Sequence, residues 1–251
     1  MGVPTLGCGC RVCTSSDPRD QRLRPSVAIE WQKDGAEPPS HRVLIDTGPD
    51  LRQQALRFAI RNIDAVFYTH PHADHILGLD DLRPLSFSHR DHKMPLYADA
   101  HTADVLERVF SYTFSADATY PTRARVQLHR LDGPVDVAGV TFTPVPLMHG
   151  KLQVTGYRFG NAAYLTDMNR LPEASMPLLE GVDIVVLDAL RPQPHPSHAT
   201  IPEAIDCAQR IGARQTWFTH MSHEVMHAEM DPGLPAGIRL SYDGLRVPIE
   251  L

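Results

Sequence analysis

Residues 64–81 read DAVFYTHPHADHILGLDD, an apolar run followed by a dense group of polar side chains and then by a second apolar pattern. Ala65–Tyr68 is short and rich in residues that favour strands, so we expect a strand there. The side chains that follow it and can bind a metal are His70, His72, Asp74 and His75. The apolar residues that come next, Ile76, Leu77, Leu79 and Leu82, recur with helical spacing and predict a helix from near Ala73.

The spacing of these polar side chains favours two metal ions over one. Alternation along an extended segment aims His70 and His72 in the same direction. The turn into the helix lets Asp74 and His75 project toward a neighbouring point. Imidazole and carboxylate ligands suit Zn, Mn or Fe. The alternative interpretation is a polar loop with several surface histidines, which does not explain why the pattern follows a strand directly.

The composition is ordinary for a globular protein. The chain has 251 residues, 42% hydrophobic and 22% charged, which suits one domain with a substantial core or two small ones. We find no apolar run of about 20 residues and no signal-peptide pattern, so we expect no membrane segment and a cytoplasmic protein. The net charge of −6 disfavours extended nucleic acid as a partner, but a small phosphate ester remains compatible with bound metals.

Three of the four cysteines lie in the segment GCGCRVC at residues 7–13. Cys8, Cys10 and Cys13 offer three thiolates, and this clustering favours a metal clip over two disulfides. A structural zinc takes four ligands, so the fourth must come from elsewhere in the chain. We expect His223, with His227 as a weaker candidate. Cys207 lies in a helical pattern and is expected to be a small buried residue.

Asp46 ends the apolar run of LIDTG at residues 44–48. It has two interpretations from the residues alone. Its carboxylate can orient a metal-binding imidazole, or it can serve only the turn into a helix that Pro49 and Asp50 open. The arginines of the polar segment 17–25 have two interpretations as well, either a phosphate contact or pairing with acidic neighbours, and we favour the second for Arg19, Arg22 and Arg24.

Polar residues close several later strands. Between residues 124 and 167 the sequence alternates in short runs with turn residues between them, which predicts strands. His149 and Asp167 each follow such a run. Further along, the run DIVVLD ends in Asp188, and the strand expected at Gln215–Thr219 is followed by His220. We expect the chain to close as strands, with a turn at Asp243–Gly244.

A proline-rich loop, RPQPHPSHAT, precedes a helix expected at Ile201–Ile211. Pro192, Pro194 and Pro196 stiffen this loop. It holds His195 and His198, and a histidine in a rigid loop beside a metal site is a candidate general acid. His198 is the better placed. Residues 113–123 are expected to be a loop and a candidate active-site flap.

Strands and helices alternate with polar residues at strand ends throughout, which predicts one α/β domain over residues 1–251, built of two stacked sheets flanked by helices. The pattern H-x-H-x-D-H resembles the signature of the metallo-β-lactamase superfamily. That resemblance implies a metallo-β-lactamase-like four-layered αβ/βα sandwich and favours the orienting role for Asp46.

Taken together, GVPTLGCGCRVC, RLRPS, LIDTG, HPHADH, THMSH and YDG are similar to the phosphoribosyl 1,2-cyclic phosphate phosphodiesterases of the carbon–phosphorus lyase pathway. The cysteine loop combined with T-H-x-x-H is the discriminating feature. This family resemblance implies hydrolysis of a small, cyclic or linear phosphodiester by a hydroxide shared between two divalent ions, Zn2+ or Mn2+. Members of this family carry a strand before the GVP segment, so we expect the first strand to be missing at the N-terminus.

The resemblance also assigns the site residues. It implies that His70, His72 and His149 hold one metal, that Asp74, His75 and His220 hold the other, and that Asp167 lies between them. Asp74 and His198 are the expected catalytic residues, with His198 protonating the leaving oxygen. Cys8, Cys10, Cys13 and His223 would hold one structural Zn2+. The expected partner is the small phosphodiester substrate, and a homodimer is a candidate assembly.

Three other functions share parts of this pattern. A tRNA-processing nuclease has the H-x-H-x-D-H core but needs a basic RNA-binding surface. A β-lactam or thioester hydrolase has the fold without an evident need for the cysteine clip. A cofactor-biosynthesis accessory protein of the pyrroloquinoline quinone type can keep the structural zinc while its active site changes. All seven predicted catalytic-metal ligands are present, which favours an enzyme.

Overall fold

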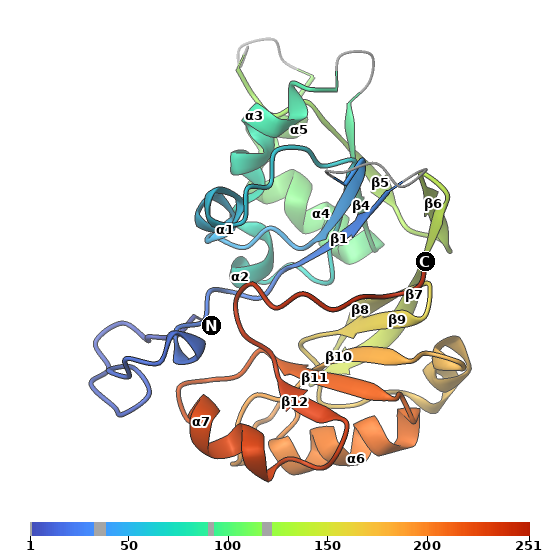
Figure 1. The fold of residues 1–251 in the computed structure, drawn as a ribbon. Helices are drawn as coiled ribbons and strands as arrows, with labels where there is room; N and C mark the ends of the chain where they lie inside the picture. The colour runs from blue at the N-terminus through green and yellow to red at the C-terminus, as the bar shows by residue number, and fades with distance from the viewer. Residues whose placement is uncertain (1, 33–38, 90–92, 117–121) are drawn as a thin grey trace. The chain divides into compact units, whose positions relative to one another are not determined.

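The computed structural model of the chain describes residues 2–32, 39–89, 93–116 and 122–251. The chain divides into two compact units, one formed by Met1–Leu23 with Pro134–Leu251 and the other by Arg24–Gly133. Each unit holds one sheet, so we call them the seven-stranded unit and the five-stranded unit (Figure 1). No helix in the described part of the chain is long and apolar enough to cross a membrane.

The sheet of the five-stranded unit has the strand order β1-β2-β3-β4-β5. Its strands are β1 Val27–Trp31, β2 His41–Ile45, β3 Ala65–Phe67, β4 Met94–Ala98 and β5 Val126–Arg130. The pair β1–β2 is antiparallel, and the other pairs are parallel. Residues 34–38, between β1 and β2, and part of the loop expected at 113–123 lie outside the described residues.

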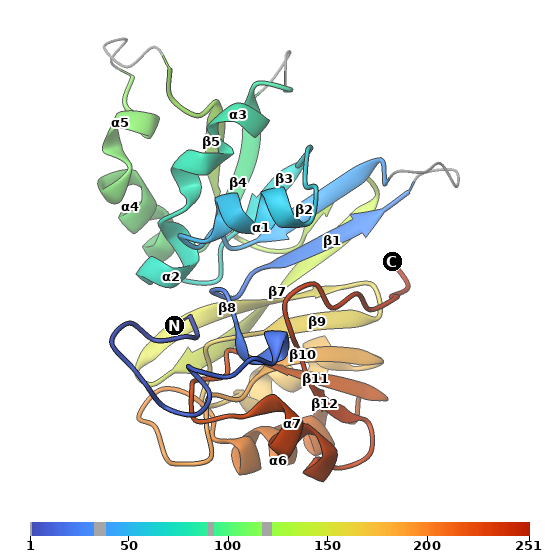
Figure 2. The ribbon, with the colours of Figure 1, turned by 60° about the vertical axis from the view of Figure 1, so that its left-hand side comes forward.

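Short helices pack on this sheet, as Figure 2 shows for α1 and α4. They are α1 Leu51–Arg57, α2 Ala73–Ile76, α3 Arg83–Ser86, α4 Ala100–Val109 and α5 Ser111–Phe114. Leu51 of α1 and Leu106 of α4 share a buried cluster with Val66 and Leu96 of the sheet. The helices α4 and α5 follow each other closely and are separated at Phe110. The helix expected from near Ala73 begins there and continues as a 3-10 helix over Leu79–Leu82.

The sheet of the seven-stranded unit has the order β12-β11-β10-β9-β8-β7-β6. Its strands are β6 Val135–Val137, β7 Val140–His149, β8 Leu152–Phe159, β9 Ala162–Leu165, β10 Ile184–Asp188, β11 Gln215–Thr219 and β12 Ile238–Leu240. The strands β6 to β9 form an antiparallel meander, and β9 to β12 are parallel. The expectation that the chain closes as strands is correct only for β12. After the turn at Asp243–Gly244 the tail carries no strand, and Asn161 exchanges hydrogen bonds with Glu250 instead.

Among the described residues, this unit has the α-helices α6 Ile201–Ile211 and α7 His227–Met230 and short 3-10 helices at Pro18–Asp20, Glu173–Leu179 and Asp231–Gly233. The sequence explains the limits of α6. Thr200 and Glu203 form a capping box at its start, and Gly212 ends it with a φ of 74°. The helix buries Ala204, Cys207 and Ala208 in the same cluster as Val185 and Phe218 of the sheet. Because the capping box fixes Thr200, it also fixes the end of the proline-rich loop that carries His198.

Candidate metal and phosphodiester site

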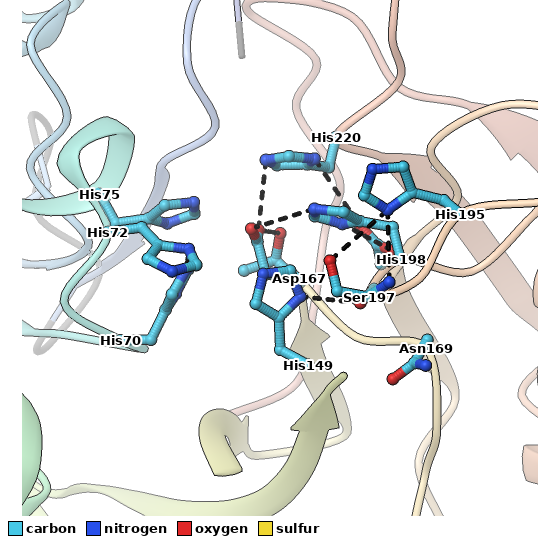
Figure 3. Close-up of polar contacts among 12 residues, drawn as sticks. His70, His72, His75, His149, Asp167, Asn169, His195, Ser197, His198 and His220 are labelled. Carbon is cyan, nitrogen blue, oxygen red and sulfur yellow. Dashed lines mark hydrogen bonds and ion pairs between the residues drawn. The ribbon is translucent and has the colours of Figure 1, made fainter. Parts of the chain in front are cut away.

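The parallel strands of the seven-stranded unit bring three predicted site residues to one edge of the sheet. Asp188 ends β10, His220 follows β11 directly, and Asp167 follows β9 by two positions. Since β9, β10 and β11 run in parallel, their carboxyl ends meet at the same edge. The Nε2 atom of His220 lies 3.3 Å from Oδ1 of Asp167, and both side chains are buried. The site residues His149, Asp167, His198 and His220 therefore come together within this unit (Figure 3).

His198 has the surroundings of a proton donor. Its Nδ1 atom lies 3.3 Å from both carboxylate oxygens of Asp188, so Nδ1–H donates to that carboxylate. Its ring stacks on the ring of His220, with 4.7 Å between centroids and 13° between planes. Its Nε2 atom lies 4.0 Å from Oδ2 of Asp167. Nε2 is thus the ring nitrogen that faces the predicted metal-bridging carboxylate.

Asp188 is the partner that fixes this histidine. Its carboxyl is completely buried and also accepts a hydrogen bond from the backbone N–H of Ala199. Burial raises the pKa of Asp188 well above its ordinary value, and the neighbouring charge of Asp167 adds to the rise while His220 opposes it. A buried carboxylate that must stay ionised needs a positive partner, and a cation beside His220 and Asp167 would supply one.

His149 ends β7 and is held by the proline-rich loop. Its Nδ1 atom donates to the carbonyl of Ser197 at 2.8 Å. Asn169 joins the same two segments, since its side chain accepts from the backbone N–H of Gly150 at 3.0 Å and donates to the carbonyl of Pro196 at 3.4 Å. A ligand atom of His149 lies within 4.8 Å of one from Asp167. Because the carbonyl of Ser197 holds Nδ1 of His149, Nε2 is the ring nitrogen that can bind a metal.

The five-stranded unit presents the other predicted ligands at the carboxyl ends of β2 and β3. Ile45 and Phe67 are paired across these strands, so Asp46 and the residues after Phe67 emerge together. Asp46 accepts a hydrogen bond from Nδ1 of His75 at 2.7 Å. The hydroxyl of Thr69 donates to the same carboxylate at 2.8 Å and accepts from Nδ1 of His70 at 2.9 Å. One buried carboxylate thus orients His75 directly and His70 through a threonine, which supports the orienting interpretation of Asp46.

The Nε2 atoms of His70 and His75, opposite the nitrogens that Thr69 and Asp46 hold, are suited to bind a metal. Nε2 of His70 lies 3.0 Å from Nδ1 of His72, a spacing at which two imidazoles can share an ion. A carboxylate oxygen of Asp74 and a ring nitrogen of His75 lie within 4.8 Å of each other. Burial raises the pKa of Asp46, and the hydrogen bonds from His75 and Thr69 oppose that rise. The donor set of each unit consists of imidazoles and carboxylates oriented by oxygen partners, and it fits a divalent transition metal.

Three of these site residues adopt left-handed backbone conformations. Asp46, Asp167 and His220 have φ values of 65°, 51° and 60°. A non-glycine residue rarely adopts this region, and such residues concentrate at functional sites where the surrounding structure holds them in place. Each of the three stands at or just after the end of a parallel strand. The abrupt turn there directs the side chain out of the sheet edge.

The cysteine loop and His223 also come together in the seven-stranded unit. Nδ1 of His223 lies 3.1 Å from Sγ of Cys8, 3.5 Å from Sγ of Cys10 and 3.6 Å from Sγ of Cys13. A hydrogen bond from the backbone N–H of Cys13 lowers the pKa of Cys10 to about 6, which favours its thiolate. Three sulfurs and one imidazole nitrogen at this spacing fit the tetrahedral ligand set of a structural zinc. His227, the weaker candidate, is outside this group and donates its backbone N–H to Asp20.

The N-terminal arginines have acidic partners, as expected. Arg19 pairs with Asp17, Arg24 with Asp50, and the buried Arg22 with Asp20. Arg22 also donates to the carbonyls of Ser222 at 3.1 Å and Val225 at 2.7 Å. It therefore holds the loop that carries His223, a role that the sequence alone did not reveal.

Comparison with known proteins agrees with this arrangement. Residues 41–221 match the family model described as "Beta-lactamase superfamily domain". The chain belongs to the β-lactamase superfamily. Within it, a solved structure described as a new diphosphatase from the PhnP family is 51% identical, with a TM-score of 0.90 over 100% of this chain and 94% of that one. These likenesses confirm the predicted fold class and family and support a metal-dependent hydrolase.

Among curated proteins, an octanoyltransferase from Porphyromonas gingivalis is 38% identical over 99% of this chain. A coenzyme PQQ synthesis protein B from Methylorubrum extorquens is 25% identical over 91% of the chain and 78% of its own length. A ribonuclease Z from Bradyrhizobium diazoefficiens is 25% identical over 60% of the chain. The chain spans about half the length of the octanoyltransferase and of the ribonuclease, 49% and 48%.

Proposed function

We propose that the chain is a metal-dependent phosphodiesterase that hydrolyses a small, cyclic or linear phosphodiester such as phosphoribosyl 1,2-cyclic phosphate. The main support is the 51% identity to a PhnP-family diphosphatase across the whole chain. The geometry of His198 agrees with this reaction, because its proton-donating nitrogen faces Asp167 while Asp188 holds the opposite nitrogen. The likeness to the octanoyltransferase covers only 49% of that protein and does not support octanoyl transfer by this chain.

The proposed metal ligands are those that the sequence resemblance assigns. His70, His72 and His149 would hold one divalent ion, Asp74, His75 and His220 the other, and Asp167 would contact both. Ions bound there would activate water at neutral pH and neutralise charge on the phosphoryl oxygens. The chain itself orients the imidazole rings that would bind these ions. The Nδ1 atoms of His70, His75 and His149 are each held by an oxygen, which leaves Nε2 for the metal.

His198 would protonate the leaving oxygen. As an imidazolium it carries a proton on Nε2, and the Asp188 carboxylate favours that charged form by accepting from Nδ1. A ligand atom of His198 also lies within 4.8 Å of ligand atoms from Asp167 and His220, so a direct ligand role is the competing assignment. Replacing His198 by Ala should cut turnover and leave the metal content intact. Loss of metal from this variant would assign His198 to the ligand set.

The Cys8, Cys10, Cys13 and His223 group would hold one structural Zn2+. Arg22 and this zinc would then fix the loop after β11 from two sides. We propose Zn2+ or Mn2+ as the catalytic ions. A cytoplasmic location, a homodimer and a single-domain organisation stay predictions of the sequence.

A substrate panel tests the proposed activity. The protein is stripped with chelator, reloaded with Mn2+ or Zn2+, and assayed on bis(p-nitrophenyl) phosphate, a pre-tRNA and a thioester, with His70→Ala as the metal-ligand control. We expect metal-dependent turnover of the phosphodiester alone, strongly reduced in His70→Ala. Turnover of pre-tRNA would favour a nuclease like the ribonuclease Z relatives, which are 25% and 26% identical. Absence of all turnover would favour an accessory role like that of the PQQ synthesis relatives.

A further inference from the structure

Several side chains donate hydrogen bonds to the carbonyls of the proline-rich loop between β10 and α6. Arg191 donates to the carbonyls of Gln193 at 3.2 Å and Pro194 at 2.8 Å and pairs with Glu224. The next carbonyls are held from the other side, since Pro196 accepts from Asn169 and Ser197 accepts from His149. Hydrogen bonds from side chains therefore fix most of the carbonyls between residues 193 and 197, and the three prolines limit the backbone further.

This loop holds His195 in one orientation. Its side chain is half-buried, while Gln193, Pro194 and Pro196 beside it are exposed. Its Nδ1 atom accepts a hydrogen bond from the backbone N–H of Ser197 at 3.3 Å. An Nδ1 that accepts leaves the ring proton on Nε2. Among the described residues the structure gives Nε2 no partner, so His195 presents a fixed donor.

The surroundings of His195 favour this neutral form. Burial lowers its pKa, and the positive charges of His198 and Arg191 lower it further. A neutral imidazole with its proton on Nε2 can donate one hydrogen bond to an oxygen of a bound molecule. It is not suited to supply the proton for cleavage, which is the role proposed for His198.

His195 lies next to the proposed proton donor but outside the metal ligand set. Its ring centroid is 5.0 Å from that of His198. Figure 3 labels both side chains, which lie next to each other. The described group of Asp167, His198 and His220 that could share an ion does not include it. Because His198 would protonate the leaving oxygen, a neighbour of His198 is placed to contact the leaving group and not the metals.

We propose that His195 is a specificity-determining residue whose Nε2–H donates a hydrogen bond to an oxygen of the alcohol leaving group, so that the site prefers polyhydroxylated or phosphorylated alcohols. This inference rests on the proposed phosphodiesterase function. It defines the class of leaving group that the site recognises.

Two substrates with different leaving groups test the proposal. Bis(p-nitrophenyl) phosphate releases an aromatic alcohol, whereas glycerophosphoglycerol releases glycerol, whose hydroxyls can accept from His195. His195→Phe keeps a ring but removes the donor, and His195→Gln restores an amide donor. The exposed His101, on α4, gives the control variant His101→Phe. Metal content and melting temperature are measured on each variant.

For His195→Phe we expect the ratio of kcat/KM for glycerophosphoglycerol over bis(p-nitrophenyl) phosphate to fall about tenfold, mainly through KM, which corresponds to one lost hydrogen bond. His195→Gln should recover most of that ratio, and His101→Phe should leave it unchanged. An unchanged ratio in His195→Phe would overturn the inference and leave the phosphodiesterase intact. If the wild type hydrolyses neither substrate, the proposed function fails, and the inference fails with it.

Discussion

The Nδ1 atom of His75 lies 2.7 Å from Oδ2 of Asp46, and both side chains are completely buried. The same carboxylate accepts from the hydroxyl of Thr69, which in turn accepts from His70. One acidic residue, held in a left-handed conformation at the end of β2, therefore orients histidines that the resemblance assigns to two different ions. Within the five-stranded unit, Asp46 thus connects a predicted ligand of one ion to a predicted ligand of the other.

Replacing Asp46 by Asn tests this link. The Asp46 carboxylate accepts from His75 and from both the hydroxyl and the backbone N–H of Thr69. Asn keeps only one accepting oxygen, so its NH2 group must face one of these donors, and the contact that orients His75 is weakened. We expect metal affinity to fall about 10–100-fold, measured by competition with a chelator. Asp99→Asn is the matched control, because Asp99 caps α4 and Asn caps helices as well as Asp does. Unaltered metal affinity in Asp46→Asn would show that the carboxylate serves only the turn.

Gly48 allows a close approach that positions Asp74. A Cβ atom at residue 48 would lie 2.3 Å from the backbone oxygen of Asp74. This turn is held in place, because the backbone of Thr47 donates to the carbonyl of His75 and accepts from the N–H of Gly78. We expect Gly48→Ala to lower the free energy of unfolding by about 1–3 kcal/mol and to weaken metal binding. Gly133→Ala, where a Cβ would meet nothing within 4 Å, should do neither. Denaturant titration with and without Mn2+ measures both effects, and equal behaviour of the two variants would contradict the argument.

Local sequence signals predict individual strands and helices, but they do not predict contacts that depend on the order of strands in a sheet. Strands and the helix α6 follow from local signals, such as the Thr200–Glu203 capping box and Gly212. The metal-binding residues carry a recognisable spacing. In contrast, the contact between Asp188 and His198 depends on the order of β9, β10 and β11 in the sheet, which no local pattern contains.

Other features lacked any sequence signal. Nothing in the sequence marks Asp46, Asp167 and His220 as left-handed, because these residue types occur in every conformation. The tail after β12 alternates like a strand, but its contact with Asn161 is too local to form a ladder, and the prediction of a strand there is wrong. Asn169 gave no signal either, although it joins the segments of His149 and His198.

Arg22 is expected to stabilise the loop that carries His223. Its guanidinium is 7% exposed and pairs with the buried Asp20, while it holds the carbonyls of Ser222 and Val225. Arg22→Met leaves Asp20 buried without its cation, so we expect a loss of about 3–5 kcal/mol in the free energy of unfolding. Arg19→Met breaks a pair with Asp17 at the surface, where solvent screens the charges, and should cost far less. Similar losses in the two variants, measured by urea unfolding, would contradict this role for Arg22.

Cys207 should behave differently from the other three cysteines. Burial in α6 raises the pKa of its thiol from 9.0 to about 11. Since the folded state keeps the thiol neutral, its stability relative to the unfolded state falls as the pH rises from about 9 to about 11. The variant Cys207→Ala should lose less stability over this window than the wild type. In native chelated protein, iodoacetamide should modify Cys8, Cys10 and Cys13 and spare Cys207, and rapid modification of Cys207 would contradict its burial.

The central claim is a dinuclear hydrolytic centre accompanied by a separate structural zinc. Metal content per chain, measured by elemental analysis on the wild type and on Cys10→Ser together with bis(p-nitrophenyl) phosphate turnover, tests it most directly. The account predicts about three divalent ions falling to about two, with turnover largely kept. One ion per chain in the wild type, with no turnover after addition of Mn2+ or Zn2+, would contradict it.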